Sequence, residues 1–107
     1  MSLVILKDPG AVIDYTFDWN DGYLDTTISP AESLLTSAWS IDPAPSPAEL
    51  AVPLTSPPSE SKTATTATAF FSGGVAGKVY IATNRVTTSG GRTDDRSLVI
   101  RVEDNQL

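Results

Sequence analysis

The final third of the chain, residues 73–102, restricts the fold more than any other part of the sequence. Residues 79–88, a run opened by a tyrosine, and the alternating residues 96–102 flank a polar, glycine-containing stretch. Alternation with a period of two is typical of a half-buried strand, and two strands around a glycine turn predict a β-hairpin. The predicted core positions are Tyr80, Ala82, Asn84 and Val86 on the first run, and Leu98, Ile100 and Val102 on the second. We expect this hairpin to close a small β-sandwich.

Three earlier runs predict further strands of the same sandwich. Residues 13–19 alternate strictly, with Ile13, Tyr15, Phe17 and Trp19 on one face. Residues 34–41 place Leu35, Ser37, Trp39 and Ile41 on one face, and residues 64–71 direct Ala67, Ala69 and Phe71 inward, with Phe70 outward. The prediction is all-β: one immunoglobulin-like antiparallel β-sandwich of about six or seven strands over residues 1–107, with Trp19, Trp39, Tyr80, Leu98 and Ile100 in its core.

Two short segments between these runs have less certain structure. Residues 24–28 fit either a short strand or a connection. Ser29 and Pro30 fit the cap and first residue of a helix of one turn at most, because proline is favoured at the first helical position. Tyr80 follows a glycine turn at the start of its strand, where immunoglobulin-like sandwiches use a tyrosine hydroxyl to bind a nearby backbone group. A ligand-stacking role for Tyr80 is the weaker interpretation.

Residues 42–62 differ in composition from the rest of the chain. They contain six of the eight prolines, mixed with alanine, serine and glutamate. Proline cannot donate to a β-ladder, so this segment is predicted to be an extended loop and not a central strand. Residues 50–54 could pair briefly with a sheet edge. A tolerated surface insertion is the simpler interpretation, and a proline-rich ligand for a binding module is the alternative.

The residue inventory excludes most catalytic chemistry. The chain has no histidine and no cysteine, which removes disulfides, thiolate metal sites, zinc sites and the commonest general base. Its net charge of −6 disfavours nucleic acid as a partner. The short apolar N-terminus does not resemble a signal peptide, and no run approaches the ~20 apolar residues of a membrane helix. We therefore expect a non-enzymatic protein without cofactor or metal, made in a cytoplasm.

The string Arg92-Thr93-Asp94-Asp95-Arg96 is the most unusual polar feature of the predicted hairpin loop. One interpretation is that Asp94 and Asp95 pair with the arginines and shape the turn. The other is docking, in which the planar guanidinium groups meet a partner's carboxylates or backbone. A carboxylate pair for glycoside hydrolysis is disfavoured, because adjacent residues on a strand point to opposite faces.

Two other surfaces carry weaker functional hypotheses. Asp18, Asp21 and Asp25 lack the spacing of an EF-hand, so a solvated acidic turn is favoured over a calcium site. With Trp19 and Tyr23 the same turn supports an alternative function, a carbohydrate-binding or surface-adhesion module. A third surface is apolar: outward-facing Val79, Ile81 and Val99, with Phe70, could form a subunit or partner interface.

Several segments together resemble a known family. They are Lys7-Asp8-Pro9, residues 14–19 (Asp-Tyr-Thr-Phe-Asp-Trp), Ser37-Ala38-Trp39, residues 65–74 (Thr-Thr-Ala-Thr-Ala-Phe-Phe-Ser-Gly-Gly) and residues 84–98. This pattern is similar to small tailed-phage and prophage proteins described as tail-associated or fibre–tail adaptor proteins. The similarity covers most of the chain apart from residues 42–62, where this sequence is longer and richer in proline.

The resemblance implies a phage or prophage virion structural protein with an immunoglobulin-like fold and no catalytic residues. Its expected partners are other virion proteins of the tail, fibre or connector, and several copies could associate with one another as a homo-oligomer. The expected location is the virion, after synthesis in the bacterial host cytoplasm. For contact with a partner we select the charged residues of the hairpin: Arg85, Arg92, Asp94, Asp95 and Arg96.

Overall fold

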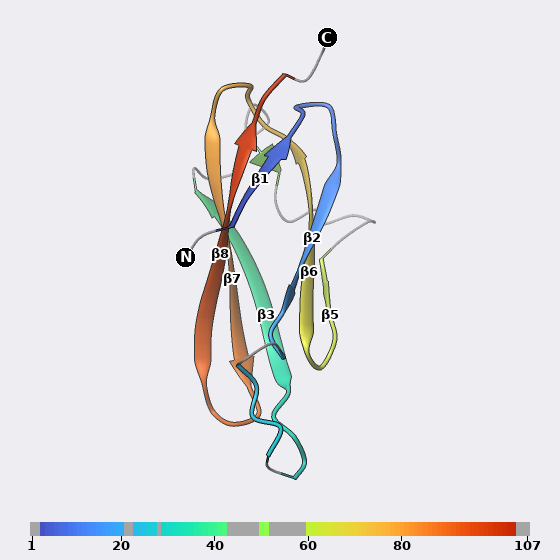
Figure 1. Ribbon diagram of the computed structural model, residues 1–107, viewed down its shortest axis with the longest axis vertical. Coiled ribbons are helices and arrows are strands. Elements are labelled where there is room, and N and C mark those ends of the chain that lie inside the picture. The colour runs from blue at the N-terminus through green and yellow to red at the C-terminus, as the bar shows by residue number, and fades with distance from the viewer. Residues whose placement is uncertain (1–2, 21–22, 28, 43–49, 52–59, 105–107) are drawn as a thin grey trace.

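The computed structural model of the chain describes residues 3–20, 23–27, 29–42, 50–51 and 60–104 (Figure 1). The secondary structure of these residues is entirely β. The strands are β1 (Leu3–Lys7), β2 (Ile13–Asp18), β3 (Leu34–Asp42), β4 (Leu50–Ala51), β5 (Ser61–Lys62), β6 (Thr66–Gly73), β7 (Val79–Thr88) and β8 (Thr93–Val102). The described residues include no helix that is long and apolar enough to cross a membrane.

The strands form two sheets, which confirms the all-β prediction. One sheet has the order β1-β8-β7-β3, and the other has the order β2-β6-β4, with β5 also paired to β6. Figure 1 shows β7 and β8 on one side of the molecule and β2, β5 and β6 on the other. All neighbouring strands are antiparallel except β1, which runs parallel to β8. A strand at residues 3–7 is not among the predicted strands, because its partner lies more than ninety positions away in the sequence.

The core lies between the two sheets and contains the five residues selected from the sequence. Trp19, Tyr80, Leu98 and Ile100 are fully buried and Trp39 is 8% exposed. The Phe17 and Trp39 rings stack at 5.6 Å across the sandwich, and the edge of Phe71 meets Trp39 at 5.9 Å. Alternation on β6, β7 and β8 is as predicted, because the inward-facing residues of each strand are buried.

One polar side chain, Asn84, lies in the centre of this core with no exposed surface. Its Oδ1 accepts a hydrogen bond from Trp19 Nε1 at 2.9 Å. Its Nδ2 donates to Ser37 Oγ at 2.8 Å and to the Ala38 carbonyl at 3.2 Å. Asn84 on β7 therefore bonds both to β3, its neighbour in the same sheet, and to the residue that follows β2 in the other sheet.

The predicted role of Tyr80 as a backbone anchor is confirmed. Its hydroxyl oxygen accepts a hydrogen bond from Val75 N at 3.0 Å, across the turn that connects β6 to β7. The ring itself is fully buried. The tyrosine thus ties the turn to the core, and its ring is not available for stacking on a ligand.

Two local predictions were wrong. Leu35 was expected in the core, but it is 57% exposed and Leu34 is buried, because the β3–β7 register shifts between Leu34 and Thr36. A bulge of this kind inserts one residue and reverses the faces beyond it. The helical turn at Ser29 and Pro30 does not form. The backbone N–H groups of Glu32 and Ser33 bond instead to the Asp25 carbonyl and to Ser89 Oγ.

The predictions for residues 42–62 are tested only in part. Leu50–Ala51 pair with Gly73 and Ser72 of β6, as expected for a brief contact with a sheet. Ser61–Lys62 pair with β6 as well. Residues 43–49 and 52–59, which include all six prolines of the segment, lie outside the described residues. Residues 24–27 form a connection with no strand.

Candidate functional site

The β7–β8 hairpin is longer than the sequence predicted, and this changes where its charges lie. Pairing continues to Thr87 and Thr93, so only residues 89–92 form the turn. Gly91 has a φ of 83°, a conformation that favours glycine, and its N–H donates to the Thr88 carbonyl at 3.0 Å. Asp94 and Asp95, expected in the loop, are therefore strand residues, and Arg96 lies in the strand as predicted. The prediction that the strand begins only at Arg96 was wrong.

Arg92, the last residue of the turn, binds a carboxylate that the sequence analysis did not select. Its Nε donates to Glu32 Oε2 at 3.0 Å and its Nη2 donates to Glu32 Oε1. Arg92 Nη2 also donates to the Tyr23 carbonyl at 2.7 Å. One guanidinium thus ties both ends of the connection between β2 and β3 to the tip of the β7–β8 hairpin.

Glu32 is 4% exposed and its carboxylate is fully supplied with donors. Besides Arg92, it accepts hydrogen bonds from Thr88 Oγ1 and from Asp25 N, the latter at 2.9 Å. The Arg92 guanidinium, the Thr88 hydroxyl and the Asp25 amide together lower the pKa of Glu32 to about 2. The same ion pair raises the pKa of Arg92 above its ordinary value. Glu32 is thus charged at neutral pH and holds this end of the molecule together.

Two cation–π contacts complete the end of the sandwich. The Arg92 guanidinium lies 4.2 Å from the centroid of the Tyr23 ring, and the Arg96 guanidinium lies 4.3 Å from the Trp19 ring. Arg96 Nη1 also donates to the Asp18 carbonyl at 3.0 Å. Burial raises the pKa of the Tyr23 hydroxyl. Both arginines of the string therefore bind groups on the segment that follows β2, and neither pairs with Asp94 or Asp95.

Two exposed charges of the hairpin, Arg85 and Asp95, lie on the outer face of the sheet. Arg85 on β7 and Asp95 on β8 are directly opposite each other and form a bidentate pair, with distances of 2.8 and 3.1 Å. Their side chains are 66% and 41% exposed. This pairing raises the pKa of Arg85 and lowers the pKa of Asp95. Asp94, also exposed, lies opposite Val86 on the other face of the hairpin and accepts a hydrogen bond from the Asp95 N–H at 2.8 Å.

The five residues predicted for partner contact thus divide into two groups. Arg92, with a side chain 45% exposed, and Arg96 bind groups on distant segments, whereas Arg85, Asp94 and Asp95 bind within the hairpin itself. A hollow next to the exposed pair is lined by Ala38, Trp39, Ser40, Thr83, Arg85 and Asp95. An exposed bidentate ion pair beside a hollow can recognise a protein surface.

The remaining candidate sites receive little support. Trp19 is fully buried beneath Arg96, so it cannot present a ring face to a sugar. Asp18 and Asp25 each accept hydrogen bonds from the backbone N–H two residues later, at 3.0 and 2.9 Å, and Asp21 lies outside the described residues. Within the described ranges, no three acidic side chains gather into a metal-binding group.

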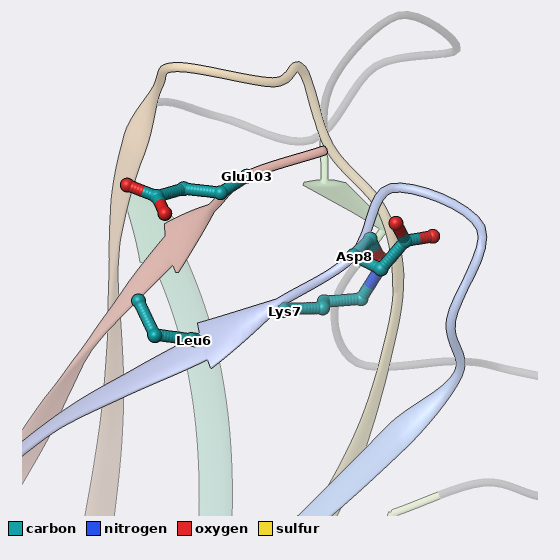
Figure 2. Close-up of a pocket in the computed structure, with 4 residues that line it drawn as sticks. All are labelled: Leu6, Lys7, Asp8 and Glu103. Atoms are coloured by element: carbon teal, nitrogen blue, oxygen red, sulfur yellow. The ribbon is translucent and has the colours of Figure 1, made fainter. Parts of the chain in front are cut away.

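At the opposite end of the molecule, a pocket of about 70 Å³ is lined by Leu6, Lys7, Asp8 and Glu103 (Figure 2). It is far smaller than the roughly 300–1,000 Å³ of a typical small-molecule site. Two more open hollows on the described surface are larger, at about 440 Å³ beside Tyr23, Glu32 and Arg92 and about 320 Å³ beside Trp39 and Arg85.

The sequence matches a known protein family. A family model described as podophage GP4 fiber-tail adaptor protein gp77 matches residues 7–101, which include β2 to β7 and nearly all of β8. A comparison with curated proteins finds no match.

Proposed function

Because the chain belongs to the podophage fibre–tail adaptor family, we propose that it is a non-enzymatic structural part of the virion that docks neighbouring tail and fibre proteins through the outer face of its β7–β8 hairpin. The family match extends over residues 7–101, which supports the sandwich from β2 to β8 as the adaptor unit. Its place is in the assembled particle, after synthesis in the host cytoplasm.

The rigidity of the hairpin end is the observation that carries this proposal. Arg92 and the buried Glu32 join the hairpin turn to the connection between β2 and β3, and Arg96 covers Trp19. Side chains held in place before binding lose little conformational freedom on docking, which favours affinity. The locked end therefore presents Arg85 and Asp95 in a fixed arrangement on the outer face, as an adaptor surface requires.

The partner surface that fits this face carries charges of both signs. The Arg85 and Asp95 side chains are 66% and 41% exposed and lie side by side. Each can therefore replace part of its bonding to the other with a bond to an opposite charge on a partner. Planar guanidinium groups bind carboxylates in a bidentate manner, which sets orientation as well as affinity. A partner with a carboxylate and a cation at matching spacing would therefore be selected over a uniformly basic or acidic surface.

We also infer that the sandwich is immunoglobulin-like. Its strand orders, β1-β8-β7-β3 facing β2-β6-β4, correspond to the two-sheet arrangement of that fold. The Tyr80 hydroxyl, bonded to Val75 N at the start of the penultimate strand, corresponds to the tyrosine corner. In such domains the loop ends and outer faces vary while the core keeps its pattern, which suits a docking role.

Particle assembly tests the docking proposal. The variant Arg85→Ala with Asp95→Ala removes the exposed pair without changing the net charge. Exposed pairs contribute only about 0–1 kcal/mol to stability, so the variant should fold normally. We expect it to fail to enter particles when it is supplied to a phage that lacks its own copy, with infectivity reduced at least tenfold.

The chain offers a matched control in Arg101→Ala with Glu103→Ala. That pair also lies on the outer face, with a distance of 2.8 Å and side chains 58% and 49% exposed. It should assemble as the unmodified protein does. Normal incorporation of the Arg85 and Asp95 variant, or equal loss in both variants, would exclude this hairpin face as the docking surface. Substitution of Arg92 and Arg96 is not a suitable test, because these side chains hold the fold together.

A further inference from the structure

Strand β1 has the composition of a buried strand but lies at the edge of its sheet. It begins with four apolar residues, Leu3-Val4-Ile5-Leu6. A continuous apolar run is typical of a strand covered on both faces. Within the described part of the chain β1 pairs only with β8, and Leu3, Val4 and Leu6 are 42%, 57% and 67% exposed.

The backbone on the free side of β1 has hydrogen-bonding groups available for another strand. The Lys7 carbonyl accepts a hydrogen bond from Glu103 N, at 2.9 Å, on the β8 side. Backbone groups of successive strand residues point to alternate sides, so those of Ile5 also face β8. The N–H and C=O groups of Val4 and Leu6 consequently point away from the sheet, along its open edge.

Lys7 does not protect this edge, although lysine is a common edge-protecting residue. It is 3% exposed, and its Nζ donates to the carbonyls of Gly73 and Asp8 at 2.7 and 2.9 Å. Burial lowers its pKa, and the neighbouring Asp8 acts in the opposite direction. Figure 2 shows the Lys7 and Leu6 side chains extending in different directions from β1. The positive charge is thus directed inward, and the edge keeps its apolar character.

The other long edge strands carry protective features that β1 lacks. Strand β2 places Asp14, Thr16 and Asp18 on its outer face. Strand β3 is interrupted by the bulge between Leu34 and Thr36. Charges and bulges both disfavour pairing with another chain. Of the six strands with five or more residues, β1 is therefore the edge best suited to accept a new strand.

We propose that β1 pairs with β1 of a second copy of this chain, antiparallel and about a two-fold axis at Ile5. This register places Val4 opposite Leu6 of the second copy, and these are the residues whose backbone groups face outward. It forms about four hydrogen bonds, because each such pair exchanges two. Lys7 lies opposite Leu3 of the second copy, so no like charges face each other.

A second copy is favoured over a different partner by this self-complementarity. The apolar run matches itself residue by residue when reversed, and a two-fold axis needs only one competent edge on each copy. Pairing of two identical edges closes the assembly at a dimer. Residues 3–6 precede the segment that matches the adaptor family, so the proposal rests on the structure of β1 and not on the family.

The outer apolar surface is consistent with this arrangement. Val4 lies beside Val99, which lies beside Ile81, in one row across three strands. Phe70, predicted to join this surface, lies instead on β6 in the other sheet. In the dimer the row would continue across the two-fold axis. An alternative dimer, with the outer faces of two copies packed together, would bury Ile81 and leave the β1 edge free.

Sedimentation equilibrium of the full chain, from micromolar to millimolar concentration, tests the proposal. We expect a monomer–dimer equilibrium for the unmodified protein. The variant Val4→Lys with Leu6→Lys should weaken dimerisation at least tenfold. Its matched control is Val12→Lys with Leu35→Lys, at apolar positions 58% and 57% exposed, which adds the same charge and should still dimerise.

Two single variants distinguish edge pairing from face packing. Leu6→Pro removes one outward N–H and should weaken the dimer, whereas Ile81→Lys should leave it intact. Thermal unfolding checks that each variant is folded. If Leu6→Pro does not fold, the dimerisation of the Val4→Lys with Leu6→Lys variant tests the edge pairing by itself. An unmodified protein that stays monomeric, a dimer that survives the lysine pair, or a dimer lost through Ile81→Lys would each overturn the proposal.

Discussion

Replacement of Asn84 by alanine is the most informative perturbation of the core. Asn84 is fully buried, and it is the acceptor for the indole N–H of Trp19, which is also fully buried. The substitution leaves that N–H without its partner. A buried donor that loses its acceptor costs about 1–3 kcal/mol, and the small cavity left by the carboxamide adds about 1 kcal/mol. We expect a loss of roughly 2–4 kcal/mol in the free energy of unfolding.

This loss is measurable by urea or thermal unfolding. At about 4 °C per kcal/mol for a domain of this size, the Tm should fall by roughly 8–16 °C. A neighbouring substitution, Thr83→Ala, supplies the control. Thr83 shares a hydroxyl hydrogen bond of 2.8 Å with Ser97, but outside the core, so its removal should cost within about 0.5 kcal/mol.

A double-mutant cycle isolates the hydrogen bond from the cavity. In the Trp19→Phe background no indole N–H is present, so Asn84→Ala should cost about 1–3 kcal/mol less than in the unmodified protein. An Asn84→Ala variant that loses under about 1 kcal/mol would refute the reasoning. Additive effects of the two substitutions would refute it as well, because they would mean that Asn84 does not act through Trp19.

Two further predictions concern the groups that hold the ends of the sandwich. Folding lowers the pKa of Glu32 from 4.5 to about 2, so the charged carboxylate should stabilise the fold fully above pH 4.5 and progressively less as the pH falls towards 2. The Tm of Glu32→Gln should therefore depend less on pH over that range than the Tm of the unmodified protein. An equal dependence of Tm on pH in both proteins would contradict this. Tyr80→Phe removes the acceptor of the Val75 N–H and should lower the free energy of unfolding, measured in urea, by about 1 kcal/mol. An unchanged urea midpoint would show that this hydrogen bond contributes no stability.

Local sequence patterns predicted the strands that alternate regularly. Residues 13–18, 66–73, 79–88 and 96–102 all lie in strands, because a side-chain period of two matches a sheet with one buried face. Prediction was less successful where the pattern is interrupted. The bulge in β3 buries Leu34 and leaves Leu35 exposed, the reverse of the prediction. The short apolar run itself does not indicate which leucine is buried, because that depends on how β3 pairs with β7.

The candidate site was predicted in part. The charged residues of the hairpin were identified, but their partners were not. Glu32 lies sixty positions from Arg92, in a segment that the sequence assigned to a helical turn. The Ser-Pro signal at residues 29–30 describes a local preference, and the hydrogen bonds of Glu32 and Ser33 to distant groups outweigh it. The residues around Glu32 in the sequence therefore do not indicate that it is buried against Arg92.

By itself, the sequence determined the all-β class, the closing hairpin, the buried faces of β6, β7 and β8, and the absence of histidine and cysteine chemistry. These follow from composition and from contacts between residues close in the chain. The tertiary structure alone decided that Arg92 and Arg96 bind groups on a distant segment while Arg85 and Asp95 pair with each other, and that, among the described residues, the apolar β1 is an edge strand parallel to β8. The reason is physical: each of these features depends on a partner from a distant segment, and only the folded chain brings the two together.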